Sequence, residues 1–180
     1  MTTRSVRPGL PLAGLIVILS AVWGLWGTPA SAQSLDMERF DGRWYEIARR
    51  PNRLQHPCNR ITIDFTARSD ADRYSVNTAC VRTDNGQTDT LRANARADVE
   101  AHQFRMTLTG VASLGGLAGQ TYQVFDHAPD YSWAILALPN KRFWWIWTRT
   151  PNPSAAVRRS TLARAAELGF DTSNVVTTGG

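Results

Sequence analysis

The residues able to perform acid–base or nucleophilic chemistry are few and widely separated in this chain. The histidines His56, His102 and His127 stand far apart, and the sequence has no Gly-x-Ser-x-Gly, His-x-x-x-His or phosphate-binding glycine motif. Because catalysis requires a nucleophile, an acid–base partner and a group that orients them, we expect no catalytic residues, no metal site and no cofactor. Each histidine is interpreted as a surface or rim residue. Haem ligation by one of them is an alternative that the sequence leaves open.

The segment that stands out is aromatic, KRFWWIWTRTP at residues 141–151. Successive side chains of a β-strand point to opposite faces, so the odd and even positions of this segment separate. Trp144 and Ile146 fall on one face. The other face carries Phe143, Trp145, Trp147 and Arg149. So much apolar area suits the binding of an apolar molecule, which needs surface more than reactive groups.

The N-terminal segment has the pattern of an export signal. Arg4 and Arg7 make a positive start, Leu10 to Trp26 is apolar, and Ala30-Ser31-Ala32 fits a small-x-small cleavage site. We therefore expect a signal peptide over residues 1–32, with an uncleaved N-terminal anchor as the alternative. No cysteine follows the apolar run, so the lipid-attachment signal of a bacterial lipoprotein is missing. The expected location is the periplasm or the exterior.

Residues 33–180 have the length of one domain with a substantial core. When Arg4 and Arg7 leave with the signal peptide, eighteen Lys and Arg remain against fifteen Asp and Glu, and the formal charge falls from +5 to +3. This surplus is small, and the two signs are interleaved. Nucleic-acid binding is therefore not expected.

Eight segments of this domain are rich in β-branched and aromatic residues and are separated by turn-forming residues. They are residues 43–50, 60–68, 73–82, 88–99, 102–110, 120–127, 131–138 and 142–150. No helical pattern fits between them, which argues against a parallel α/β fold. The sequence predicts an all-β protein built as an antiparallel sandwich or a closed barrel.

Two of these segments show which face is buried. In segment 60–68, Ile61, Ile63 and Phe65 share one face. In segment 88–99 the apolar face carries mostly small side chains: Leu91, Ala93, Ala95, Ala97 and Val99. This strand would leave space beside it. An eight-stranded barrel is about the size that holds one small ligand.

The two cysteines, Cys58 and Cys80, both lie in the expected exported part. An even cysteine count in an oxidising compartment favours a disulfide. If segments 60–68 and 73–82 pair around a turn at Ser69–Asp70, positions whose numbers sum to 138–140 lie opposite each other, and the cysteines sum to 138. A structural disulfide is predicted, with two free thiols as the alternative.

A single helix is predicted late in the chain. Asn152 is the expected N-cap, Pro153 begins the helix, Ser154 to Leu168 continues it, and Gly169 suits its C-terminal end. Its apolar face would consist of Val157, Leu162, Ala165 and Leu168. We expect this helix to pack against the outside of the sheet.

These patterns together resemble the lipocalin family, in particular the bacterial outer-membrane lipocalin and apolipoprotein D branch. The resemblance runs through nearly all of residues 33–180. It is carried by Gly42-Arg43-Trp44 at the start of RWYEIAR, Cys58, NTAC ending at Cys80, TYQVFD and DYSWAIL within 121–136, and WIWTRTP at 145–151. The Thr-Asp-Tyr of the family's second segment is only partly matched, by Asp130 and Tyr131.

The resemblance implies an eight-stranded antiparallel up-and-down β-barrel with a C-terminal α-helix on its flank. It implies structural roles for Gly42, Trp44 and Arg149, with the arginine lying across the tryptophan that plugs the closed end. It also implies that Trp145 and Tyr122 line a ligand pocket. Phe143 and Trp147 join these two as candidate ligand-binding residues through strand alternation alone.

The sequence therefore predicts an exported lipocalin that binds and carries a small hydrophobic ligand, such as a fatty acid or a lysophospholipid, in lipid storage, transport or membrane maintenance. We do not expect an enzyme. Two alternatives stay open: an enzyme of lipid-like substrates on the same barrel, and a protein-interaction module whose barrel is filled by its own side chains. Peripheral contact with a membrane and the oligomeric state are also left open.

Overall fold

The computed structural model describes residues 35–53, 55, 57–70, 72–110 and 119–179. The expected signal peptide and His56 lie outside these residues. The described part of the chain is mostly strand, with one four-residue helix, one longer helix and a short terminal strand.

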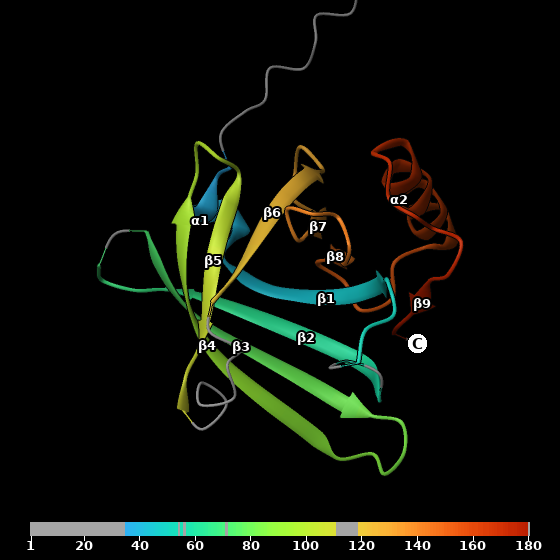
Figure 1. Cartoon of the computed structure of the whole chain (residues 1–180), viewed down its shortest axis with the longest axis horizontal. Coiled ribbons are helices and arrows are strands. Elements are labelled where there is room, and N and C mark those ends of the chain that lie inside the picture. The colour runs from blue at the N-terminus through green and yellow to red at the C-terminus, as the bar shows by residue number, and fades with distance from the viewer. Residues whose placement is uncertain (1–34, 54, 56, 71, 111–118, 180) are drawn as a thin grey trace, which may run out of the picture. The chain divides into compact units, whose positions relative to one another are not determined.

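Eight antiparallel strands form a closed barrel, drawn in Figure 1. They are β1 (Gly42–Arg49), β2 (Cys58–Ala67), β3 (Arg73–Arg82), β4 (Thr88–Asp98), β5 (Gln103–Leu108), β6 (Gln120–His127), β7 (Trp133–Ala137) and β8 (Trp144–Thr148). Each strand pairs with the next in the chain, and β1 pairs with both β2 and β8, which closes the ring. The predicted eight-stranded up-and-down barrel is confirmed, and the sandwich alternative is excluded.

A short ninth strand, β9 (Val176–Thr177), extends the edge of β1 beyond the point where β2 stops pairing with it. Thr178 donates its backbone N–H to Ile47 O at 3.1 Å, and Gly179 donates to Asn59 O at 3.1 Å. The C-terminal segment thus satisfies backbone groups that the sheared end of the barrel would otherwise leave unpaired.

The register of the β2–β3 hairpin differs from the predicted one. Ile61 lies opposite Cys80 and Ala67 opposite Tyr74, so paired positions sum to 141 rather than 138–140. The hairpin closes where Arg68 donates its N–H to the carbonyl of Arg73 at 3.0 Å, which places the centre of the turn one residue later in the chain than Ser69–Asp70. A local register shift near Cys58 then brings the two cysteines together.

The longer helix, α2 (Ala155–Glu167), begins two residues later than predicted. Its N-cap is Ser154, whose hydroxyl accepts the N–H of Val157 at 3.3 Å, so Asn152 lies before the helix and does not cap it. Leu168 is the C-cap, and Gly169 follows with a φ of +82°.

The barrel has an inner and an outer core because strand side chains alternate. The inner core fills one end of the barrel with aromatic and aliphatic side chains, including Phe40, Trp44 and Phe65. The outer core lies between the strands and α2 (Figure 1), and its members include Trp144, Ile146, Ala165 and Phe170. Burial of this outward face explains why a helix with few large apolar side chains stays attached to the barrel.

Candidate functional site: the barrel cavity

A cavity of about 1260 Å³ occupies the part of the barrel that the inner core leaves unfilled. Its walls come from strands β1 to β6 and β8, and its rim comes from the loops that follow β1 and β7. Strand β4 contributes Leu91 and Ala93 to the wall, whereas Ala95 and Ala97 pack into the inner core, so of the small side chains predicted from segment 88–99 only Ala93 borders the cavity. Leu91 is 47% exposed, which marks the open end.

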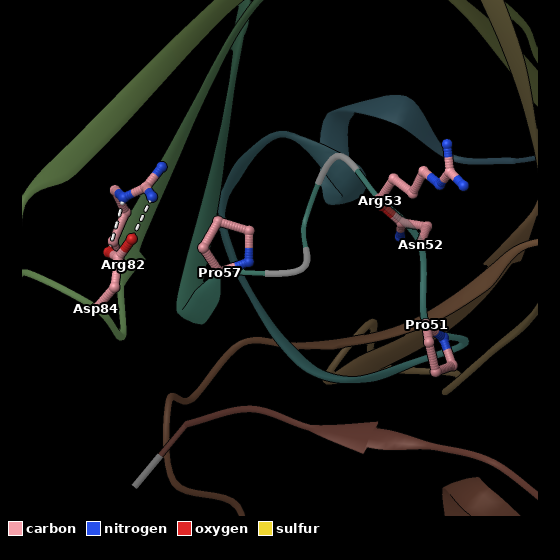
Figure 2. A pocket seen from close by; sticks show the side chains of 6 residues that line it. All are labelled: Pro51, Asn52, Arg53, Pro57, Arg82 and Asp84. Atoms are coloured by element: carbon pink, nitrogen blue, oxygen red, sulfur yellow. Dashed lines mark hydrogen bonds and ion pairs between the residues drawn. The ribbon is translucent and has the colours of Figure 1, made fainter.

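The loop between β1 and β2 forms one side of the mouth. Figure 2 shows a shallow pocket beside it, lined by Pro51, Asn52, Arg53, Pro57, Arg82 and Asp84. All of these except Asp84 also line the large cavity, so the shallow pocket and the mouth adjoin. Asn52 Oδ1 accepts the backbone N–H of Gln55 at 2.9 Å, which links two residues of this loop.

The four candidate ligand-binding side chains, Phe143, Trp145, Trp147 and Tyr122, all line this cavity. The rings of Tyr122 and Trp145 lie 5.3 Å apart between centroids, and Tyr122 stacks on Phe104 at 5.6 Å. Their contact with a ligand stays a prediction. Trp144, at an even position of the same strand, faces outward. It packs into the outer core and donates its indole N–H to Asp171 O at 3.2 Å.

A buried polar cluster interrupts the apolar wall. Glu46 and Arg49 are almost completely buried and form an ion pair at 2.6 Å. Gln55 Nε2 donates to Glu46 Oε2 at 3.0 Å, and the side-chain oxygen of Gln55 accepts the indole N–H of Trp145 at 2.8 Å. Arg49 also donates to the carbonyls of Gln55 and Cys58. One hydrogen-bond network therefore joins the cavity wall to the loop at the mouth.

Burial changes the acid–base properties of two lining groups. It raises the pKa of the Glu46 carboxyl from 4.5 to about 7, against the opposing effects of the Arg49 charge and the hydrogen bonds from Arg49 and Gln55. It also raises the pKa of Tyr122 to about 12, and the nearby charge of Glu46 adds to that shift. Tyr122 therefore stays a neutral phenol at physiological pH.

The predicted disulfide is present and lies in the cavity wall. Cys58 and Cys80 are bonded, with their Cα atoms 5.4 Å apart, and both line the cavity. The bridge ties the start of β2 to β3 across the hairpin, at the end of the barrel that carries the mouth.

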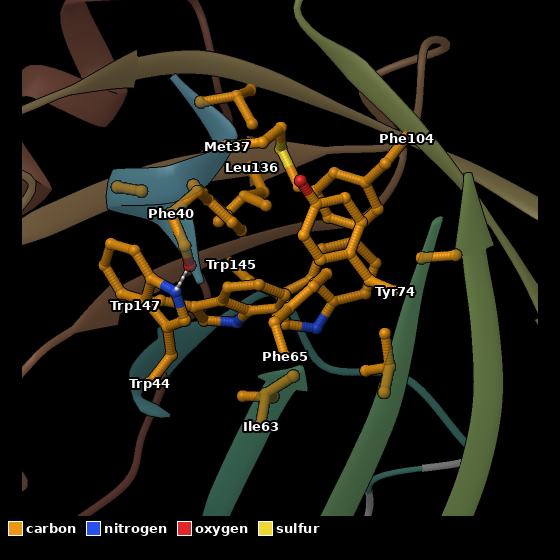
Figure 3. Close-up of a cluster of buried hydrophobic side chains, with 14 of the residues drawn as sticks. Met37, Phe40, Trp44, Ile63, Phe65, Tyr74, Phe104, Leu136, Trp145 and Trp147 are labelled. Atoms are coloured by element: carbon orange, nitrogen blue, oxygen red, sulfur yellow. Dashed lines mark hydrogen bonds between the residues drawn. The ribbon is translucent and has the colours of Figure 1, made fainter. Parts of the chain in front are cut away.

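The opposite end of the barrel is closed by a short helix, α1 (Met37–Phe40), and the start of β1. Phe40 is fully buried, and its carbonyl accepts the indole N–H of Trp44 at 2.8 Å. Figure 3 shows Phe40, Trp44, Phe65 and Trp147 meeting there. Tyr131 secures the helix because its hydroxyl accepts the N–H of Asp36 at 2.8 Å. Ligand access from this end is therefore blocked.

Arg149 covers this closed end from outside. Its guanidinium carbon lies 3.8 Å from the centroid of the Trp44 ring. The same side chain donates to Arg43 O at 2.9 Å and to Arg39 O at 2.5 Å, which fixes both α1 and β1. Gly42 has a φ of +91°, a region that favours glycine, and an added Cβ would stand 3.5 Å from Arg149.

Three residues that shape the cavity or its closed end were not predicted from the sequence. Phe40 sits in a four-residue helix, which is too short to show any hydrophobic period. Glu46 shares the inward parity of Trp44, and a charge at an inward position was the available signal. Gln55 lies in a loop, where no periodic pattern applies.

Groups for other chemistries are sparse in the described residues. No group of three or more His, Cys, Asp or Glu side chains that could hold a metal occurs there. His127 stacks on Tyr131 and shares a hydrogen bond with the carbonyl of Ala128, so its surroundings are structural. Within the described ranges, no helix is long and apolar enough to span a membrane.

Comparison with known proteins gives one family. The lipocalin-like domain matches residues 35–179. The chain is 29% identical over 143 residues to outer membrane lipoprotein Blc of Escherichia coli strain K12, covering 79% of this chain and 78% of the relative. It is 26% identical over 147 residues to temperature-induced lipocalin-1 of Arabidopsis thaliana, with the same shares covered. A third relative, outer membrane lipoprotein Blc of Vibrio cholerae, is 23% identical over 89% of this chain and 91% of its own.

Solved structures agree with the fold. Apocrustacyanin C2 superposes with a TM-score of 0.62 at 13% identity, covering 80% of this chain and 79% of that one. Insecticyanin from the tobacco hornworm Manduca sexta gives a TM-score of 0.62 at 17% identity, with 82% of each chain covered. At these identities the likeness extends to the barrel architecture alone.

Proposed function

Because this chain belongs to the lipocalin family, we propose that it is an exported carrier that binds a fatty acid or a lysophospholipid in its barrel cavity. The observation that supports this most directly is the cavity of about 1260 Å³ whose wall includes Trp145, Tyr122 and Trp147. Drug-sized ligands occupy sites of roughly 300–1000 Å³, so the space is sufficient for a long acyl chain.

The apolar wall can supply the affinity that such a carrier needs. Burial of roughly 300 Å² of acyl surface at about 25 cal/mol/Å² provides about 7 kcal/mol before the cost of association. Micromolar affinity corresponds to a net free energy of about 8 kcal/mol, so burial of further acyl surface has to offset the cost of association. A carrier has to release its cargo, and micromolar affinity permits this.

Export and a role in lipid storage, transport or membrane maintenance are part of the same proposal. The N-terminal pattern at residues 1–32 supports export, as do the bacterial relatives named outer membrane lipoproteins. We propose a location in the periplasm or outside the cell. The disulfide Cys58–Cys80 is in keeping with an oxidising compartment.

The proposal is tested by titrating the purified protein of residues 33–180 with fatty acids and lysophospholipids while following tryptophan fluorescence. Saturable quenching is expected, and Trp145→Ala should weaken the affinity about ten-fold, because a large part of the apolar wall is lost. Trp144→Phe is the matched control, since Trp144 packs outside the barrel. Unchanged affinity in Trp145→Ala would overturn the assignment of this residue to the site.

The two alternatives make different predictions. An interaction module with a filled barrel requires no cavity, and the cavity of this protein argues against it. An enzyme on the same barrel would convert a lipid-like substrate, and a metabolite screen would detect turnover. Native mass spectrometry of the protein as purified separates the carrier from both, because a bound lipid of unaltered mass is expected only for the carrier.

A further inference from the structure

The mouth of the cavity is rich in positive charge. Five cationic side chains line it: Arg50, Arg53, Arg82, Lys141 and Arg142. The acidic side chains in the same lining are Glu46, which is buried against Arg49, and Asp89. The positive charge therefore exceeds the negative charge at the open end of the barrel, and the two signs are not evenly mixed there.

Three of the five cations are engaged within the protein. Arg50 pairs with Asp171 at 2.5 Å. Arg82 pairs with Asp84 and, at 3.2 Å, with Asp89. Lys141 donates to the carbonyl of Leu168 at 2.9 Å and lies over the Phe125 and Phe170 rings, so it joins the barrel to α2. These contacts give each of the three a structural role.

The other two, Arg53 and Arg142, have no carboxylate partner among the described residues. Arg142 lies with its guanidinium carbon 5.5 Å from the Phe143 ring centroid, a contact that leaves its N–H donors available. Arg53 follows Asn52, and Figure 2 shows its side chain extending away from the Arg82–Asp84 pair. Both side chains are exposed, so neither is held by packing.

The position of Arg53 is set by its neighbours. The hydrogen bonds of Asn52 with Gln55 fix the turn that contains Arg53, and Gln55 is in turn bonded to Glu46 and Trp145 of the cavity wall. Arg53 lines both the large cavity and the shallow pocket beside its mouth. A group attached to a chain in the cavity would meet this arginine as it leaves the barrel.

We propose that the ligand carries an anionic head group, a carboxylate or a phosphate, which Arg53 binds at the mouth while Arg142 adds to the attraction from the β7–β8 loop. The inference rests on the proposed function and narrows it to anionic amphiphiles. A guanidinium forms charge-assisted hydrogen bonds with either oxyanion, and its fork fits their geometry. Arg82 offsets one of the two negative charges of Asp84 and Asp89, and the one that remains is smaller than the combined charge of Arg53 and Arg142.

The test compares three amphiphiles of equal acyl length: palmitate, lysophosphatidate with a palmitoyl chain, and neutral monopalmitoylglycerol. Affinities are measured at pH 8 by tryptophan fluorescence for the wild type, Arg53→Gln, Arg142→Gln and the double variant. We expect the wild type to bind the two anions about ten-fold more tightly than the neutral lipid. The double variant should lose this preference and retain the affinity for the neutral lipid within about two-fold.

Palmitate carries a carboxylate and lysophosphatidate carries a phosphate. A preference for only one of them assigns the site to that head group. Arg159→Gln is the matched control, since Arg159 is exposed on α2 and outside the cavity lining. Arg53→Lys keeps the charge and should retain most of the preference for anionic lipids that the wild type shows. Thermal melts verify that all variants are folded.

Equal affinities of the wild type for charged and neutral lipids would overturn this inference and leave the carrier function intact. The inference is also overturned if Arg159→Gln weakens anion binding as much as the double variant does. Failure of all three lipids to bind would contradict the proposed function itself.

Discussion

Trp145 of strand β8 and Gln55 of the β1–β2 loop are joined by a hydrogen bond of 2.8 Å from the indole N–H to the side-chain oxygen. Gln55 is also bonded to Glu46, so this contact connects an aromatic wall residue, a buried ion pair and the loop at the mouth. The shape of the cavity at its open end therefore depends on one amide side chain. Four predictions follow from this network, from the closed end of the barrel and from the disulfide.

Gln55→Leu should destabilise the protein by about 2 kcal/mol. The change removes the acceptor of Trp145 and a donor to the buried Glu46, and unpaired buried polar groups are costly. Urea unfolding measures the effect. Gln123→Leu is the control, since Gln123 is half-buried on β6 and makes no side-chain hydrogen bond in the described structure. Equal losses in the two variants would contradict the role of Gln55.

Stability should fall as the pH rises from about 4.5 to about 7, through the titration of Glu46. Its pKa is raised in the folded protein, so the folded state binds the proton more tightly than the unfolded state. The favourable contribution is complete below about pH 4.5 and is lost as the pH passes 7, with an upper limit of about 3 kcal/mol. Glu46→Gln cannot titrate, and its unfolding free energy should lack this decline. If the free energy of unfolding changes with pH in the same way for the wild type and Glu46→Gln, the decline does not come from Glu46.

Arg149→Ala should cost about 2 kcal/mol, from the loss of the contact with the Trp44 ring and of two hydrogen bonds to backbone carbonyls. Arg149→Lys retains the charge but not the planar guanidinium with its several donors. Its free energy of unfolding should lie between those of the alanine variant and the wild type. Thermal and urea unfolding measure both. Arg159→Ala removes an equal charge from the exposed face of α2 and should have little effect.

Removal of the disulfide by the double change Cys58→Ala and Cys80→Ala should lower the free energy of unfolding by about 3 kcal/mol. The bridge closes a segment of 22 residues, and its loss increases the entropy of the unfolded chain. Guanidinium unfolding with and without reductant provides the measurement. A wild type that is equally stable in both conditions would show that the bridge contributes nothing.

Strand parity predicted much of the arrangement at β8. Trp145 and Trp147 line the cavity while Trp144 and Ile146 pack outside against the helix side of the barrel, as alternation requires. The same rule predicted the inward face of β2, where Ile61, Ile63 and Phe65 are buried. Parity is a local property of extended backbone, so it can be read from sequence alone.

The turn and cap details were less predictable. The turn between β2 and β3 is centred one residue later than predicted, because several turns suit the same polar residues and the position of the turn sets the register. The N-cap of α2 was wrong by two residues, since Asn152 and Ser154 are both competent caps and tertiary packing selects between them.

The sequence by itself determined the strand segments, their faces, the flanking helix and the presence of two cysteines close enough to join, and the closed barrel was implied by the resemblance to lipocalins. Only the tertiary structure decided that Glu46, Gln55 and Trp145 form one network, that Phe40 closes the barrel, and that Arg53 and Arg142 at the mouth have no carboxylate partner among the described residues. The physical reason is the range of the interactions. Alternation and turn chemistry act between near neighbours in the chain, whereas hydrogen-bond partners, ion pairs and cavities depend on segments that meet only when the ring of strands closes.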